Sequence, residues 1–161
     1  PTSDALRLYA YVDADHAGDP ESRLSVSGYI VYLSGAPILW ASKRQQCSAI
    51  SSSESEFYAA STLGLEVQYM RRLLDQLGCT QTGPTEVFED NASVIFASNG
   101  KSSFRRLKHI DTRVHRLRQQ VQEGLLVLTK VESASNVADI FTKAVRVDTF
   151  VRLSRRFLNL F

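Results

Sequence analysis

Apolar and polar positions alternate in the period of a β-sheet over the first part of the chain. Between residues 6 and 15, the even positions are apolar and the odd positions carry polar or aromatic side chains. A period of two that includes aromatic residues predicts a strand. Similar runs over 25–34 and 37–42 predict two further strands, and Gly35 between them permits a tight reversal. Three strands with short links predict an antiparallel meander.

After residue 50 the spacing becomes helical. Glu56 shares one helix face with apolar residues at 60, 63, 67, 70, 74 and 77, which predicts a long helix that begins within Ser51–Ser53 and ends at Gly78. The remaining pattern predicts strands over 85–90 and 125–131, and helices over 91–97 and 110–124, from residue 135 or 136, and in a C-terminal amphipathic segment, 146–161. Strands that alternate with helices are typical of the α/β class.

Length and composition predict one globular domain. The 161 residues, 43% hydrophobic and 22% charged, suit a single domain over 1–161 with a core at about 5–145. No apolar run approaches the roughly 20 residues that a membrane-spanning helix needs, so we expect no membrane association. Cys47 and Cys79 are too few for a disulfide scaffold and lack metal-site spacing, which favours reduced thiols in an intracellular protein.

Charge is concentrated in one stretch. The net charge of +2 does not by itself indicate a nucleic-acid partner, but residues 101–118 hold seven basic side chains against one acidic side chain. We take six of them as candidates for binding a phosphate backbone: Lys101, Arg105, Arg106, Lys108, Arg113 and Arg116. The alternative is an ordinary solvated helix face.

Four acidic residues stand at the ends of predicted elements. Asp13 and Asp90 follow strands, and Glu56 and Asp139 lie in the first turns of helices. Each has a structural explanation as well: Asp13 starts a turn, Asp90 caps a helix and Asp139 favours a helix dipole. For Glu56 two registers stay open, because both Ser53 with Glu56 and Ser51 with Glu54 fit the S-x-x-E capping box.

The four acids share a topology. Active sites in open α/β sheets form at the carboxyl ends of strands and at the helix starts that face them, so neighbouring strands would bring all four together. Like charges about 4 Å apart repel by roughly 4 kcal/mol at an effective dielectric near 20, so such a cluster requires divalent cations. Oxygen ligands without cysteine or histidine favour Mg²⁺ or Mn²⁺, and two such ions about 3.5 to 4 Å apart suit phosphodiester hydrolysis.

Six short motifs occur in series, and their order and spacing resemble the ribonuclease H domain of copia-type retrotransposon polyproteins. They cover most of residues 6 to 143 and read Asp13-Ala-Asp-His-Ala-Gly-Asp19, Ser25-Val-Ser-Gly-Tyr29, Ser51-Ser-Ser-Glu-Ser-Glu-Phe57, Glu89-Asp-Asn91, Lys108-His-Ile-Asp111 and Ala138-Asp-Ile-Phe-Thr-Lys143. The resemblance implies a ribonuclease H-like fold, with three antiparallel strands joined to two parallel ones and helices on both faces.

The same resemblance implies an activity and a site. The family's D-E-D-D catalytic and metal-binding set falls on Asp13, Glu56, Asp90 and Asp139, and holds two Mg²⁺ ions, with Mn²⁺ as a substitute. Such an enzyme cleaves the RNA strand of an RNA–DNA hybrid and leaves 5′-phosphate and 3′-hydroxyl ends. Ser51, Ser52 and Asn91, beside the carboxylates, are candidates for contacts with sugar hydroxyls, which distinguish RNA from DNA.

The family also implies partners and a location. A reverse transcriptase domain of the same polyprotein is the expected partner, inside a cytoplasmic virus-like particle or, as the alternative, in the nucleus. One departure concerns the loop before the last catalytic residue, where cellular ribonucleases H usually place a histidine and residues 131–136 contain none.

Two other functions fit parts of the sequence. A catalytically silent tether that binds nucleic acid for a neighbouring polymerase would need no carboxylate set. An integrase-type transposase core shares the fold class but expects a glutamate as its final acid, where this chain has Asp139.

Overall fold

The computed structural model describes residues 6–19, 21–46, 48–100 and 111–158, which form one mixed sheet covered by helices. In chain order the elements are β1 Leu8–Asp15, β2 Val26–Leu33, β3 Ala36–Arg44, α1 Ser52–Gln76, β4 Thr85–Glu89, α2 Ala92–Ser98, α3 Asp111–Gln122, β5 Leu126–Lys130, the short 3₁₀ helices η3 Ser133–Ser135 and η4 Val137–Phe141, and α4 Val147–Phe157.

The sheet has the strand order β3-β2-β1-β4-β5, with β1, β2 and β3 antiparallel and with β4 and β5 parallel to β1. This arrangement confirms the expected ribonuclease H-like topology of three antiparallel and two parallel strands. Ser34 and Gly35 link β2 to β3 and both have positive φ, at 51° and 86°. Two such residues make the type I′ turn whose twist suits a hairpin, so the predicted reversal is confirmed.

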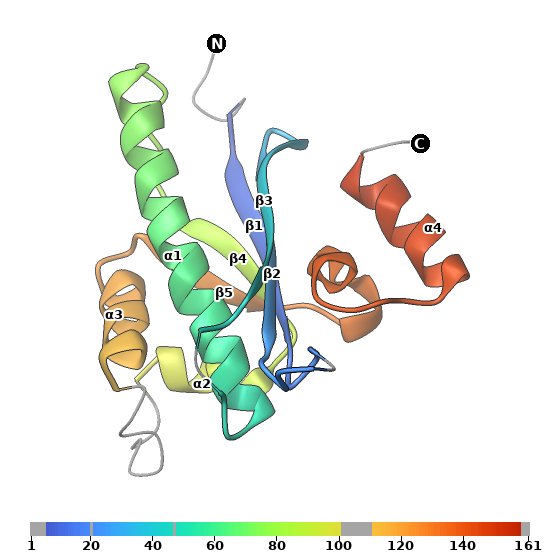
Figure 1. Ribbon diagram of the computed structural model, residues 1–161. Coiled ribbons are helices and arrows are strands. Elements are labelled where there is room, and N and C mark those ends of the chain that lie inside the picture. The colour runs from blue at the N-terminus through green and yellow to red at the C-terminus, as the bar shows by residue number, and fades with distance from the viewer. Residues whose placement is uncertain (1–5, 20, 47, 101–110, 159–161) are drawn as a thin grey trace.

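Helices cover both faces of the sheet (Figure 1). On one face, α1 packs its buried residues Phe57, Leu63 and Val67 against the even-numbered positions of β1, and α3 packs against α1. On the other face, Val137 of η4 and Phe157 of α4 pack against a second cluster that β2 contributes. The period-two pattern of β1 thus separates two hydrophobic cores.

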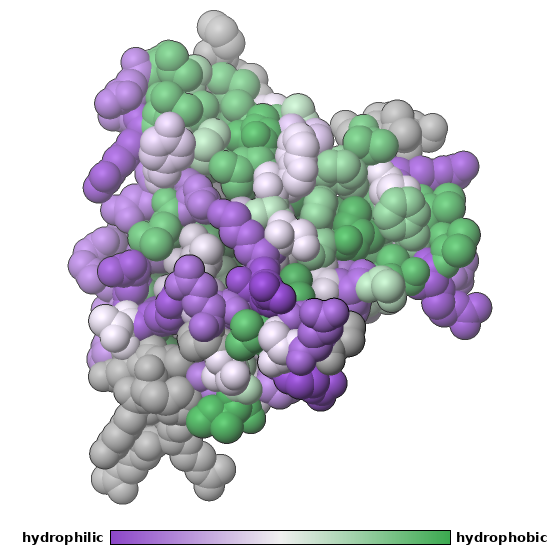
Figure 2. Space-filling view, viewed as in Figure 1, coloured by the Kyte–Doolittle hydropathy of each residue, from purple (hydrophilic) through white to green (hydrophobic). Residues whose placement is uncertain are grey.

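The last helix is apolar on more than one side. Leu153 is fully buried, whereas Val147 and Phe150 are exposed. Figure 2 shows such apolar side chains beside basic ones over the α4 end of the molecule, at the right of the view. In the described part of the chain, no helix combines the length and the apolar character needed to cross a membrane.

The first turn of α1 decides between the two capping registers. Ser51 is the N-cap, and its hydroxyl accepts a hydrogen bond from the Glu54 amide at 3.2 Å. A carboxylate oxygen of Glu54 accepts from the Ile50 amide at 2.7 Å. The Ser51–Glu54 register is therefore the one that forms, with the Glu54 carboxylate bonded to the amide of Ile50, the residue before the N-cap, and Glu56 has no capping role.

The segment that carries Asp139 differs from the predicted helix. It consists of the short 3₁₀ helices η3 and η4, because tertiary contacts hold it. The Asn136 side chain accepts from the Ala138 amide at 3.1 Å and donates to the Val12 carbonyl of β1 at 2.8 Å. Asn136 is fully buried, so this one side chain both starts η4 and fastens it to the strand that carries Asp13.

Gly28 permits the close approach of η4 to the sheet. It pairs with Asp13 in the β1–β2 ladder. A Cβ at Gly28 would lie 2.5 Å from the Thr142 methyl group, 2.9 Å from the Phe141 Cβ and 3.0 Å from the Ala138 carbonyl oxygen. Contacts below 3.0 Å force a shift, so only glycine lets the residues after Asp139 approach Asp13.

We predict that Gly28→Ala lowers the free energy of unfolding by about 1 to 3 kcal/mol, because the added methyl overlaps backbone-held atoms of η4 and its C-terminal flank. Urea denaturation measures the loss. Gly83→Ala is the matched control, since a Cβ there meets nothing within 4 Å. Equal stability of the two variants would contradict this account of the Gly28 contact.

Candidate active site

Three carboxyl groups meet at the end of the sheet where β1 and β4 stop. Asp13 comes from β1, Glu56 from the second turn of α1, and Asp90 from the residue after β4. One carboxylate oxygen of each lies within 4.8 Å of those of the other two. The parallel pairing of β1 with β4 places the first and third side by side, and α1 begins over the same end of the sheet (Figure 1).

The Asp13 carboxyl is buried among polar and charged groups. It is 3% exposed, and Thr142, just beyond η4, donates its hydroxyl to Asp13 Oδ2. Burial raises the pKa of Asp13 to about 6, although the Thr142 hydrogen bond and the nearby Lys143 ammonium both lower it. Asp139 and Asp90 add to the rise through repulsion.

Asp139 is connected to Asp13 through the ammonium group of Lys143. Lys143 Nζ is 3.0 Å from Asp139 Oδ1 and 3.7 Å from Asp13 Oδ2. Burial lowers the pKa of Lys143, but Asp13 and Asp139 together outweigh this and leave the pKa raised. The structure thus brings the four predicted carboxylates to one place, three in mutual proximity and the fourth through Lys143.

Among the carboxyl groups of the site, Glu56 has the surroundings that most disfavour its ionised form. Burial, followed by repulsion from Glu89, Asp13 and Asp90, raises its pKa far above the usual range. Its Oε2 atom is buried and has no hydrogen-bond partner in the described part of the chain. A bound cation would satisfy that oxygen and reverse the electrostatic preference for the protonated form.

Glu89 is a site residue that the sequence interpretation missed. It is fully buried, and its Oε1 accepts from the Asn91 amide at 2.9 Å. Burial raises its pKa to about 8, with Asp90 and Asp13 adding to the rise. Its Oε2 has no partner among the described residues. The period of β4 carried the signal, because Thr85, Val87 and Glu89 occupy the core-facing positions.

The sequence interpretation assigned no role to Lys143 or Thr142, and it named Asn136 only as one of two possible helix starts. The spacing of four between Asp139 and Lys143 was a usable signal, since it suggests that the two side chains share a face of a helical turn. Nothing local indicated that Thr142 and Asn136 reach across to β1. Their contacts join residues 129 and 124 positions apart, respectively.

The donor set suits a hard divalent cation. Asp13, Glu56, Asp90 and Asp139 offer carboxylate oxygens alone, the ligand type that Mg²⁺ and Mn²⁺ prefer. The buried, unpartnered Glu56 Oε2 is an independent sign of fit, because a buried polar atom is normally satisfied.

The predicted substrate-binding residues have mixed positions. Ser51 and Asn91 use their side-chain oxygens to cap α1 and α2, beside the carboxylates, and Ser52 is exposed in the first turn of α1. The Arg113 guanidinium lies 3.7 Å from the centre of the Tyr58 ring, and Arg116 is exposed. The other four basic candidates, Lys101, Arg105, Arg106 and Lys108, lie outside the described residues.

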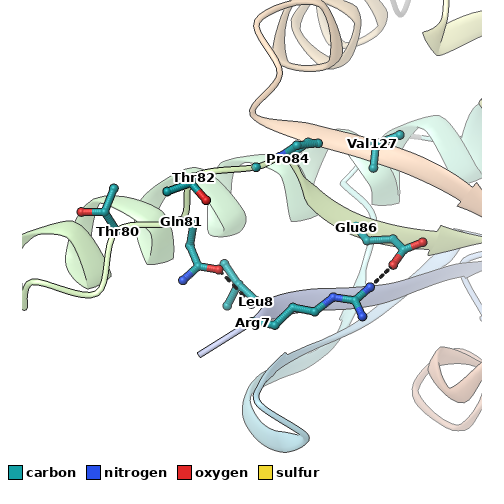
Figure 3. Close-up of a pocket in the computed structure, with 9 residues that line it drawn as sticks. Arg7, Leu8, Thr80, Gln81, Thr82, Pro84, Glu86 and Val127 are labelled. Carbon is teal, nitrogen blue, oxygen red and sulfur yellow. Dashed lines mark hydrogen bonds and ion pairs between the residues drawn. The ribbon is translucent and has the colours of Figure 1, made fainter. Parts of the chain in front are cut away.

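A cavity of about 310 Å³ lies at the opposite end of the sheet. Figure 3 shows Arg7 paired with Glu86 across it, while Gln81 binds the backbone amide of Leu8. This cavity is remote from the carboxylates, since Leu8 begins β1 and Asp13 lies near its other end. It is therefore separate from the candidate active site.

Comparison with known proteins places the chain in a family. It is 39% identical over 143 residues to the Retrovirus-related Pol polyprotein from transposon TNT 1-94 of Nicotiana tabacum, a match that covers 89% of this chain. The corresponding polyprotein from transposon RE1 of Arabidopsis thaliana is 37% identical over 145 residues, or 90% of this chain. An RNase H1 from Halobacterium salinarum NRC-1 shares the fold, with a TM-score of 0.58 over 84% of this chain and 94% of that chain, at 18% identity. The chain belongs to the ribonuclease H domains of copia-type Pol polyproteins.

This ribonuclease H domain spans about a tenth of the length of these relatives. It matches 11% of the tobacco polyprotein and 10% of the Arabidopsis one. A solved LC11-RNase H1 in complex with RNA/DNA hybrid has the same fold, with a TM-score of 0.63, 14% identity, and coverage of 84% of this chain and 94% of that chain. No model of a protein family matches the sequence.

We predict that Glu89→Gln stabilises the metal-free domain at high pH. The folded pKa of about 8 exceeds the ordinary 4.5, so folding is progressively weakened as pH rises between these values. The glutamine variant, which cannot ionise, should gain several kcal/mol over the native chain at pH 9, at most about 5 kcal/mol from this linkage, and about 1 kcal/mol or less at pH 5.

Urea denaturation in a chelator, at both pH values, measures that gain. The exposed Glu132→Gln serves as the control and should show no pH-dependent gain. A gain for Glu89→Gln that is equal at the two pH values would show that ionisation of Glu89 is not its cause.

Proposed function

We propose that this ribonuclease H domain hydrolyses the RNA strand of RNA–DNA hybrids through two divalent cations. The convergence of Asp13, Glu56 and Asp90 to within 4.8 Å, with Asp139 beside them, carries the proposal. A domain that only bound nucleic acid would gain nothing from such mutual repulsion. An integrase-type core is disfavoured because it expects a glutamate as its final acid, where this chain has Asp139.

Each carboxylate would take part in holding the ions. Asp13 lies close to Glu56 and Asp90 and is connected to Asp139 through Lys143, so it would help to hold the cations. Two such ions supply the Lewis acidity that lowers the pKa of an attacking water and stabilises charge on the departing 3′ oxygen. The products would be a 5′-phosphate and a 3′-hydroxyl.

The surrounding residues would hold the four carboxylates in fixed positions. The Thr142 hydroxyl directs Asp13 Oδ2, and Asn136 holds η4 against β1 so that Asp139 faces the same space. Rigid placement matters because the reacting groups must be held close to their productive geometry. The buried Glu89 carboxyl would supply further negative potential behind Asp90.

Substrate recognition would depend on shape and charge rather than on base sequence. Ser51, Ser52 and Asn91 border the carboxylates and would approach the sugar hydroxyls of the RNA strand. Arg113 and Arg116 of α3, with Lys101, Arg105, Arg106 and Lys108 before them, would bind backbone phosphates. The hybrid held by the LC11-RNase H1 of like fold supports this class of substrate.

The partner in the polyprotein would be a reverse transcriptase. One structure of like fold is the Prototype Foamy Virus Protease-Reverse Transcriptase, with a TM-score of 0.55, 13% identity, and coverage of 88% of this chain but 21% of that chain. The polyprotein relatives support the same arrangement and an intracellular, particle-associated setting.

We predict that Asp13→Asn and Asp90→Asn each abolish cleavage of a labelled RNA strand in a hybrid with Mg²⁺. Without Mg²⁺ their free energies of unfolding should stay equal to the native value or rise by about 1 kcal/mol, because repulsion is relieved. Asp75→Asn, at the far end of α1, is the control and should retain activity.

Gel analysis of the RNA with Mg²⁺, Mn²⁺ or neither ion tests the function itself. Intact RNA after incubation with folded, ion-loaded native domain, together with tight hybrid binding, would identify a silent tether instead. Cleavage that persists in the two asparagine variants would move the active site elsewhere.

We predict that Arg113→Ala combined with Arg116→Ala weakens hybrid binding, because phosphate contacts are lost. The slope of the logarithm of the binding constant against the logarithm of the salt concentration should become shallower by about one to two units. Fluorescence anisotropy across a salt series measures the slope. The control pair is Arg72→Ala with Arg155→Ala, two exposed arginines elsewhere that change the net charge equally. Equal slopes in both pairs would assign the effect to net charge alone.

A further inference from the structure

Lys143 forms ion pairs with two of the four site carboxylates, Asp13 and Asp139. Asp13, Glu56 and Asp90 form a compact trio within 4.8 Å, whereas Asp139 is connected to Asp13 through the Lys143 ammonium. Lys143 Nζ is 3.0 Å from one carboxylate oxygen and 3.7 Å from the other. A positive charge already stands between the two acids on this side, in a place where a cation would also bind.

The ammonium is held by charge and can leave. The Lys143 side chain is 41% exposed, while that of Asp13 is 4% exposed and that of Asp139 13%. A lysine has a flexible four-carbon stem and a strongly hydrated head, so rotation into solvent is open to it. The carboxylates, in contrast, are fixed by β1 and η4 and stay in place when the lysine leaves.

We propose that Lys143 acts as a built-in competitor for one of the two divalent cations, occupying the edge between Asp13 and Asp139 until the second ion displaces it. The inference rests on the proposed two-cation function. The first ion enters the trio of Asp13, Glu56 and Asp90 while Lys143 remains in place. The second ion binds more weakly, because it must expel the ammonium from the Asp13–Asp139 edge.

A structural salt bridge and a competitor predict opposite effects on metal affinity. If Lys143 only braced the site, its removal would loosen Asp13 and Asp139 and weaken metal binding. If it competes, removal of the ammonium eliminates both its repulsion of the incoming ion and the need to displace it. Both interpretations predict that the metal-free protein loses stability when the positive charge between the two carboxylates is removed. They differ in the metal affinity that they predict.

The test is a titration of Mn²⁺ into the metal-free native domain and three variants at pH 8.5, with free Mn²⁺ counted by electron paramagnetic resonance. Lys143→Met removes the charge and keeps the length, and Lys143→Arg restores the charge. Lys43→Met is the matched control, an exposed lysine on β3. Thermal melts in a chelator check folding of each variant.

Competition predicts that Lys143→Met binds the weaker ion roughly three- to tenfold more tightly than the native domain. Its metal-free melting temperature should fall below that of Lys43→Met. Lys143→Arg and Lys43→Met should titrate like the native chain. A native domain that binds one ion while Lys143→Met binds two would support the same conclusion.

Unchanged or weaker binding of the second ion in Lys143→Met would overturn the inference, as would equal tightening in Lys143→Arg. Hybrid cleavage separates this failure from failure of the proposed function. A native domain that cleaves RNA with Mg²⁺, beside a Lys143→Met variant with native metal affinity, contradicts the competition alone. A native domain that neither cleaves nor binds a second ion, with no gain in Lys143→Met, contradicts both.

Discussion

Mutual repulsion among carboxyl groups at one end of the sheet is the interaction on which the rest of the site depends. Asp13, Glu56, Asp90 and Asp139 gather there with Glu89 behind them, and burial makes the negative charges of Asp13, Glu56 and Glu89 costlier than in water. The metal-free protein offsets this cost in three ways: protons favoured on Glu56 and Glu89, the Thr142 hydroxyl bonded to Asp13, and the Lys143 ammonium between Asp13 and Asp139. Under the proposed function, divalent cations would take over this neutralisation from the protons and the ammonium.

Holding such a cluster requires a rigid frame, and the fold provides it from both faces of the sheet. The pairing of β1 with β4 sets Asp13 beside Asp90, and the Ser51 cap sets the first turns of α1 so that Glu56 points to them. On the opposite face, the segment with Asp139 consists of two short 3₁₀ helices, and its position depends on Gly28 and Asn136. Stability and function are therefore linked most closely at this second face.

The residues proposed to bind substrate also have structural roles. Arg113 stacks on Tyr58 of α1, so part of its interaction stabilises the α1–α3 contact, while Arg116 is exposed and available to phosphates. Ser51 and Asn91 combine capping with a position beside the carboxylates. Residues that fix helix starts thus also border the space where a sugar hydroxyl would lie.

The amino-acid sequence determined the strands, the long helix and the identity of the four acids. Period-two and helical spacing report which side of an element faces the core, and this local information sufficed for β1 and α1. Local spacing left the capping register at Ser51 open and predicted a regular helix around Asp139, where the structure has 3₁₀ turns. It gave no role to Glu89, Thr142 or Lys143. The roles of Thr142 and Asn136 were decided only in the tertiary structure, because their contacts with β1 join residues more than a hundred positions apart. The Ser51 cap and the Asp139–Lys143 pair are local contacts, but only the structure shows which of the possible local pairings forms.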